Sequence, residues 1–147
     1  MSNPRDFLDV EQLVIDKLKA DVTTAKDVVR YAGQLDDVIE GRLVKGFPLV
    51  AVLFTGDAPE QIDGMNYRVP TEFTVLVVAH TMKGSADTTA SAGEVVRAVR
   101  DSLTNQRLAD NLERLLLGPT ALVYSSTTAT AYQIGFTVAM DQEFDPE

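Results

Sequence analysis

The feature that most limits how this chain can fold is a strictly alternating stretch near its end, from Thr130 to Met140. Every second residue from Tyr132 to Met140 is large and apolar, and the residues between them are small or mildly polar. Successive side chains of a β-strand point to opposite faces, so this pattern predicts a strand with one buried face.

The two faces of this strand have different expected neighbours. Ile134 and Phe136 are expected in the core, whereas Gln133 and Thr137 face away from it. The second face carries no charge, so another surface can pack against it.

Two other stretches repeat apolar residues at steps of three and four, which is the spacing of an amphipathic helix. The first runs from Phe7 to Leu18, with Asn3 as its expected N-cap and Pro4 at its first position. The second runs from Asp87 to Leu103. A shorter helical pattern covers residues 34–43, and residues 25–33 fit either a short strand or an irregular segment.

Further apolar runs predict the remaining strands. Leu49 to Thr55 is almost continuously apolar, as a strand buried on both faces is, and Tyr67 to Thr81 alternates over a longer stretch. Gly56 to Asn66 has the composition of a loop. Two short strands are expected at residues 112–117 and 122–125, on either side of Gly118 and Pro119.

Together these elements predict a fold of the α+β class. We expect one domain over residues 1–147, with a largely antiparallel sheet of four to five strands and helices packed on one face. A chain of 147 residues is long enough to bury a core of its own. The acidic tail at residues 141–147 is expected to fray.

The composition argues against several classes of function. The formal net charge is −9, whereas a basic surface is the usual electrostatic sign of nucleic-acid binding. Such a charge favours solubility, and it also suits a surface that lets DNA pass without holding it. Cysteine is absent, so disulfides and thiolate metal sites are not expected. No signal-peptide pattern or apolar run of membrane-spanning length is visible, which predicts a cytosolic protein.

The residues that carry chemistry do not form a recognisable active site. His80 is the only histidine, and a catalytic triad or zinc site needs partners for it. The acidic residues Asp57, Glu60 and Asp63 do not follow the spacing of an EF-hand loop. Phosphate-binding and dinucleotide-binding glycine motifs are absent. We therefore expect no enzyme activity, no catalytic residue, no cofactor and no metal.

The chain nevertheless resembles a known protein family over most of its length. The resemblance lies in six segments, in chain order: FLDVEQLVIDKL, PLVAVLFTG, EFTVLVVAHT, AGEVVRAVRDSL, LERLLLG and TAYQIGFTVAM. They are similar to the tail-terminator proteins of tailed bacteriophages, in particular the family found in Mu-like prophages.

The resemblance implies a structural protein of virion assembly. Tail terminators form a ring, commonly a hexamer, that caps the tail tube, stops tube polymerisation and provides the surface for head–tail joining. The implied partners are further copies of the chain, the tail tube protein and a head-completion or neck protein, without specific nucleic-acid binding or a membrane. The implied locations are the host bacterial cytoplasm during assembly and the virion tail.

Two sets of polar residues are candidates for the interfaces of such an assembly. The segment from residue 56 to 66 is longer than a hairpin needs, and long loops are often functional. We expect contacts from the following residues: Asp57, Glu60, Gln61, Asp63, Asn66, Gln133 and Thr137. For the residues of the segment from 56 to 66, the alternative is a mobile loop without a partner. Alternatives for the whole chain are another neck, head-completion or secretion-apparatus scaffold, or a small enzyme or ligand-binding domain.

Overall fold

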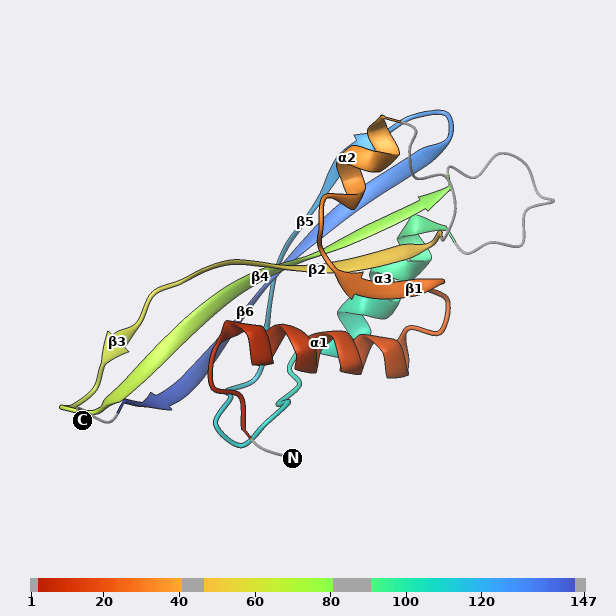
Figure 1. Cartoon of the computed structure of the whole chain (residues 1–147). Helices are drawn as coiled ribbons and strands as arrows, with labels where there is room; N and C mark the ends of the chain where they lie inside the picture. The colour runs from red at the N-terminus through yellow and green to blue at the C-terminus, as the bar shows by residue number, and fades with distance from the viewer. Residues whose placement is uncertain (1–2, 41–46, 81–90, 145–147) are drawn as a thin grey trace.

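A computed structural model describes residues 3–40, 47–80 and 91–144 of the chain. The described residues form three helices and six strands (Figure 1), in the following order: α1 (Phe7–Asp21), β1 (Asp27–Arg30), α2 (Gln34–Ile39), β2 (Leu49–Asp57), β3 (Glu60–Gln61), β4 (Asn66–His80), α3 (Ala92–Leu103), β5 (Leu116–Ser125) and β6 (Ala129–Glu143). The α+β class is confirmed.

The strands form one mixed sheet in the order β1-β2-β4-β6-β5, with the short β3 paired to β4. Strand β1 runs parallel to β2, and the other pairs are antiparallel. The sheet has six strands, so the expectation of four to five was wrong. Strand β1 lies within residues 25–33, where a short strand was one of the two alternatives. Strand β3 has two residues, too few to show alternation in the sequence, and its pairing with β4 defines it.

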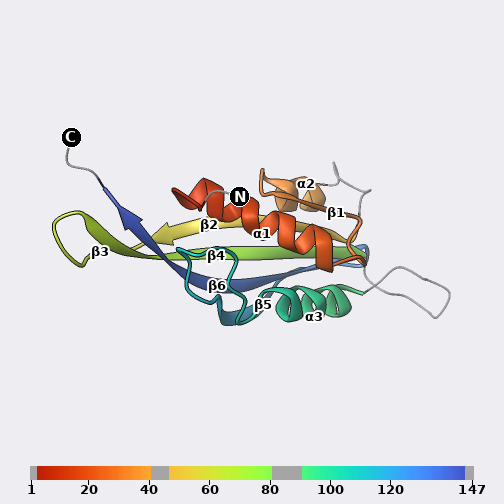
Figure 2. The same cartoon turned by 90° about the horizontal axis from the view of Figure 1, so that it is seen from below.

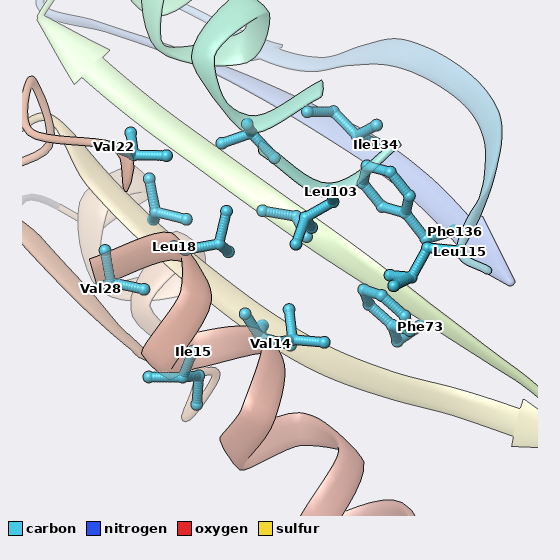
Figure 3. Close-up of a cluster of buried hydrophobic side chains, with 14 of the residues drawn as sticks. Val14, Ile15, Leu18, Val22, Val28, Phe73, Leu103, Leu115, Ile134 and Phe136 are labelled. Carbon is cyan, nitrogen blue, oxygen red and sulfur yellow. The ribbon is translucent and has the colours of Figure 1, made fainter. Parts of the chain in front are cut away.

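The larger core lies between the sheet and two helices (Figure 3). Val14 and Leu18 of α1 and Leu103 of α3 pack there against side chains from the centre of the sheet. Ile134 and Phe136 are 0% and 2% exposed, and Gln133 is exposed. The alternation of the last strand therefore predicted its buried face correctly.

A second core covers part of the opposite face of the sheet. Val38 of α2 packs there with Phe47 and with alternate residues of the central strands, such as Ala51 and Leu76. Helices therefore lie on both faces: the expectation of one face holds for α1 and α3 and was wrong for α2. The reason is that β2 and β4 are apolar on both faces where they cross the centre of the sheet.

Several element boundaries differ from those expected. Helix α1 begins later than Asn3 and Pro4 suggested, because Asp6 is its N-cap: its Oδ1 accepts hydrogen bonds from the backbone N–H groups of Leu8 (3.0 Å) and Asp9 (3.2 Å). Ser91 caps α3 in the same way through Glu94. Three expected segments lie outside the described residues. They are the start of the second amphipathic helix at 87–90, the end of the short helical pattern at 41–43 and the end of the acidic tail at 145–147.

The last two strands are longer than expected. Strand β5 continues through Gly118 and Pro119, which were expected to separate two strands. An edge strand tolerates proline because its outward N–H needs no partner, and the register of β5 shifts at this point. Strand β6 continues to Glu143, so residues 141–143 of the acidic tail are paired with β4.

No helix within the described ranges has the length and apolar character needed to cross a membrane.

Candidate functional site

The outer parts of β4 and β6 extend past the helices as a narrow arm (Figures 1 and 2). We define the arm as residues 58–69 and 140–144, which contain β3, the start of β4 and the end of β6. Both long strands have 15 residues and pair over their whole lengths. The segment from 56 to 66 is therefore largely hairpin rather than loop: β2 continues to Asp57, and β3 pairs with Arg68 and Tyr67.

Asp63 holds the tip of the arm in its turn. Its Oδ1 accepts hydrogen bonds from the backbone N–H of Met65 (3.1 Å) and from the backbone N–H (3.0 Å) and side-chain amide (2.9 Å) of Asn66. The Asn66 amide and then the two backbone N–H groups lower the pKa of the Asp63 carboxyl group. The Asp63 carboxylate therefore accepts its hydrogen bonds from groups of the same chain, as in an Asx-type turn.

Arg68 braces the base of the arm. Its Nε and Nη2 donate to the two carboxylate oxygens of Glu113, at 2.6 and 3.0 Å, and its Nη1 lies 3.5 Å from Glu60 Oε2. The hydrogen bonds with Glu113 raise the pKa of Arg68 and lower that of Glu113. One cation therefore has two carboxylate partners, and the arm as a whole remains acidic.

The tip also exposes large apolar side chains. Ile62, Met65 and Phe144 are 65%, 40% and 51% exposed. The ring of Phe144 meets that of Tyr67 edge-on, with 5.3 Å between centroids, and the Phe144 N–H donates to the Met65 carbonyl at 2.7 Å. An apolar cluster rimmed by acidic side chains is typical of an interaction surface.

A second candidate surface is the part of the sheet face that α2 leaves uncovered. An open hollow of about 250 Å³ lies there, and its lining includes the following residues: Thr55, Glu72, Thr74, Gly118, Pro119, Gln133, Gly135 and Thr137. Gln133 and Thr137 thus lie on the outward face, as their alternation predicted. Their role in an interface stays a prediction.

A third surface is a groove of about 560 Å³ between α3 and the edge strand β5. It is lined by Gly93, Val96, Arg97, Arg100, Asp101, Thr104 and Leu117. Arg97 and Arg100 are exposed and make no ion pair with a described residue. Sequence reasoning missed this groove, because β5 forms its other wall.

The residues considered for chemistry do not converge. His80 packs edge-on against Phe47, with ring centroids 4.9 Å apart. Asp63 and Glu60 are engaged separately, in the turn and with Arg68. Among residues 3–40, 47–80 and 91–144, no group of three or more histidine, cysteine or acidic side chains could hold a metal ion.

The chain was compared with models of protein families, with curated proteins and with solved structures. A family model described as "Bacteriophage Mu, Gp37" matches residues 7–138. A solved chain from the "Virion of native gene transfer agent (GTA) particle" has a similar fold, with a TM-score of 0.59 and 15% identity over 90% of this chain and 94% of that one. A search of the curated proteins gives no match.

Proposed function

Since the chain belongs to the bacteriophage Mu Gp37 family, we propose that it is a tail terminator, a structural protein that caps the tail tube as a ring. In this role it stops tube polymerisation and provides the surface to which the head is joined. The resemblance to a Mu-like phage tail protein is confirmed by the family match, and the terminator role is the more specific step. The whole chain, residues 1–147, acts as one tail-terminator-like domain.

The observation that carries the proposal is the arm with its exposed apolar tip. The outer parts of the two 15-residue strands extend past the helices and leave Ile62 and Phe144 exposed to water. Exposed apolar side chains do not stabilise an isolated protein. A neighbour that covers this tip would remove apolar surface from water and so stabilise the contact. The arm is therefore suited to joining copies of the chain.

The uncovered part of the sheet face supports a second contact. Its small and polar side chains, including Gln133, Thr137 and Thr74, can lie against a flat partner surface. We assign this face to the tail tube or to the head-completion protein, and the arm to the next subunit. The ring we propose is a hexamer that assembles in the host cytoplasm and remains in the virion tail, and the net charge of −9 suits passing DNA.

Electron microscopy of tail tubes tests the proposal. Purified protein is mixed with tubes of the tail tube protein of the same phage and imaged in negative stain, and tube length is measured when the protein is present during polymerisation. We expect one ring at a tube end and shorter, uniform tubes. Tubes that stay uncapped and grow without limit would contradict a terminator role.

A parallel sample distinguishes a terminator from a neck or head-completion protein. Filled heads without tails are incubated with the chain in a parallel sample. A terminator binds tubes without heads present, whereas a neck protein binds the head and leaves bare tubes unoccupied.

A further inference from the structure

We propose that the arm of one copy docks into the groove between α3 and β5 of the next copy. This rests on the proposed ring, and it identifies the two surfaces that build it. The ligand of the groove is thus a second copy of this chain, presented as an acidic hairpin with an apolar tip.

The charges of the two surfaces are complementary. Exposed carboxylates on the arm come from Glu60, Asp141 and Glu143, whereas its cation Arg68 is already bound to Glu113. The groove presents Arg97 and Arg100, with Asp101 at its side. Complementary charge guides encounter and sets the register of a contact. Exposed arginines on one helix turn suit carboxylates because a guanidinium group can form two parallel hydrogen bonds.

The apolar parts match as well. The arm tip carries the exposed side chains of Ile62, Met65 and Phe144. The lining of the groove includes the apolar side chains of Val96 and Leu117. Interfaces between proteins commonly centre on an apolar anchor in a pocket, surrounded by a charged rim. The arm supplies such an anchor, and the groove supplies both the pocket and the rim.

The positions of the two surfaces exclude a contact within one copy. The arm lies at one end of the sheet, and α3 lies toward the other end (Figures 1 and 2). A contact between unlike surfaces of two copies is heterologous, and it generates a ring when the rotation between copies closes. One arm and one groove per copy are sufficient to continue the ring around its whole circumference.

Charge reversal on each side tests the contact. The groove variant is Arg97→Glu with Arg100→Glu, and the arm variant is Glu60→Lys with Glu143→Lys. Asp63 is left unchanged because it forms the turn. Glu60→Lys places a second cation near Arg68, but Arg68 keeps its two hydrogen bonds with Glu113 and exposed charges contribute little to stability, so we expect the fold to tolerate the change. A cooperative thermal unfolding transition in each variant would show that the variant is folded.

Mixing the two variants is the decisive measurement. Each variant alone sets like charges against each other, so we expect loss of rings on tube ends and loss of ring mass in native mass spectrometry. In an equal mixture every contact between unlike variants pairs opposite charges, so rings with alternating subunits return. A chain carrying all four substitutions also restores opposite charges and forms rings alone. A matched control, Lys19→Glu with Lys26→Glu, changes the net charge by the same amount at exposed residues outside the arm and the groove lining, and it keeps rings.

The possible results separate this inference from the proposed function. If the wild type caps tubes and both variants do so equally well, the docking mode is wrong and the terminator role stands. If both variants fail and neither the mixture nor the fourfold variant recovers, the arm or groove contacts the tube instead, which also overturns the docking mode. If the wild type forms no ring even on tubes, the terminator role fails and the docking mode fails with it.

Discussion

Arg68 on β4 and Glu113 in the segment before β5 form an ion pair with two hydrogen bonds, 2.6 Å from Nε to Oε2 and 3.0 Å from Nη2 to Oε1. The Glu113 N–H also donates to the Ala139 carbonyl of β6 at 2.9 Å. Residues 45 positions apart in the chain are thereby joined at the base of the arm. The ion pair thus joins β4, and the Glu113 N–H joins β6, to the segment that leads from α3 to β5.

The arm is expected to loosen in acid before the core unfolds. The pKa values of Glu113 and Asp63 are lowered from their ordinary values of 4.5 and 3.8 by the hydrogen bonds with Arg68 and with Asn66. A lowered folded-state pKa contributes stability above the unfolded-state pKa, and this contribution is lost as the pH falls through the folded-state value. The protection factors of the Met65 and Asn66 amides should therefore fall as the pH drops below 3.8 and through the lowered pKa of Asp63. Unchanged protection of these amides across that range would contradict the prediction.

Phe136→Ala should destabilise the protein by about 3–5 kcal/mol, because it leaves a cavity in a close-packed core. Phe136 is 2% exposed and stacks on Phe73, with ring centroids 5.5 Å apart. Gln133→Ala is the matched control on the outward face of the same strand and should change the free energy of unfolding by about 0.5 kcal/mol or less. Denaturant midpoints measure both values, and equal losses would mean that the assignment of faces is wrong.

Gly118→Ala should destabilise the protein by about 1–3 kcal/mol through steric crowding. A Cβ atom at Gly118 would lie 2.9 Å from the carbonyl oxygen of Gly135 and 3.2 Å from its carbonyl carbon, both backbone atoms that cannot turn aside. Gly56→Ala is the control, since a Cβ atom there meets nothing within 4 Å. Thermal unfolding compares the two variants, and a Gly118→Ala protein as stable as the Gly56→Ala protein would exclude this close approach of β5 and β6.

Asp63→Ala should release the tip of the arm while leaving the core folded. The substitution removes the acceptor for the Met65 and Asn66 N–H groups, whereas Asp63→Asn keeps an oxygen in the same place. In NMR spectra the Met65 and Asn66 amide signals should shift or broaden in the alanine variant and move less in the asparagine variant. Identical spectra for all three proteins would show that backbone pairing alone shapes the turn.

How much the sequence could predict depended on the range of the interactions involved. The alternation around Ile134 and Phe136 predicted the buried face of β6, because a period of two is a property of the strand itself. Apolar spacing likewise predicted α1 and α3, although the cap at Asp6 was missed because Asn3 and Pro4 offered an equally good local pattern.

The surfaces proposed for assembly could be predicted only in part. Gln133 and Thr137 were expected on the outward face, and they line a hollow there. The acidic segment around Asp63 was expected to be a loop, because nothing in its own sequence shows that Glu60 and Gln61 pair with β4. The groove beside Arg97 was missed because its walls come from elements that are distant in the chain.

The sequence by itself thus determined the periods of its elements, the apolar residues available for a core, and the family resemblance. The tertiary structure decided which strands are neighbours, that β5 passes through Gly118 and Pro119 as an edge, and that the two long strands project as an arm. The physical reason is that side-chain periodicity is set within each element by backbone geometry, whereas strand pairing and exposed grooves arise from contacts between distant segments.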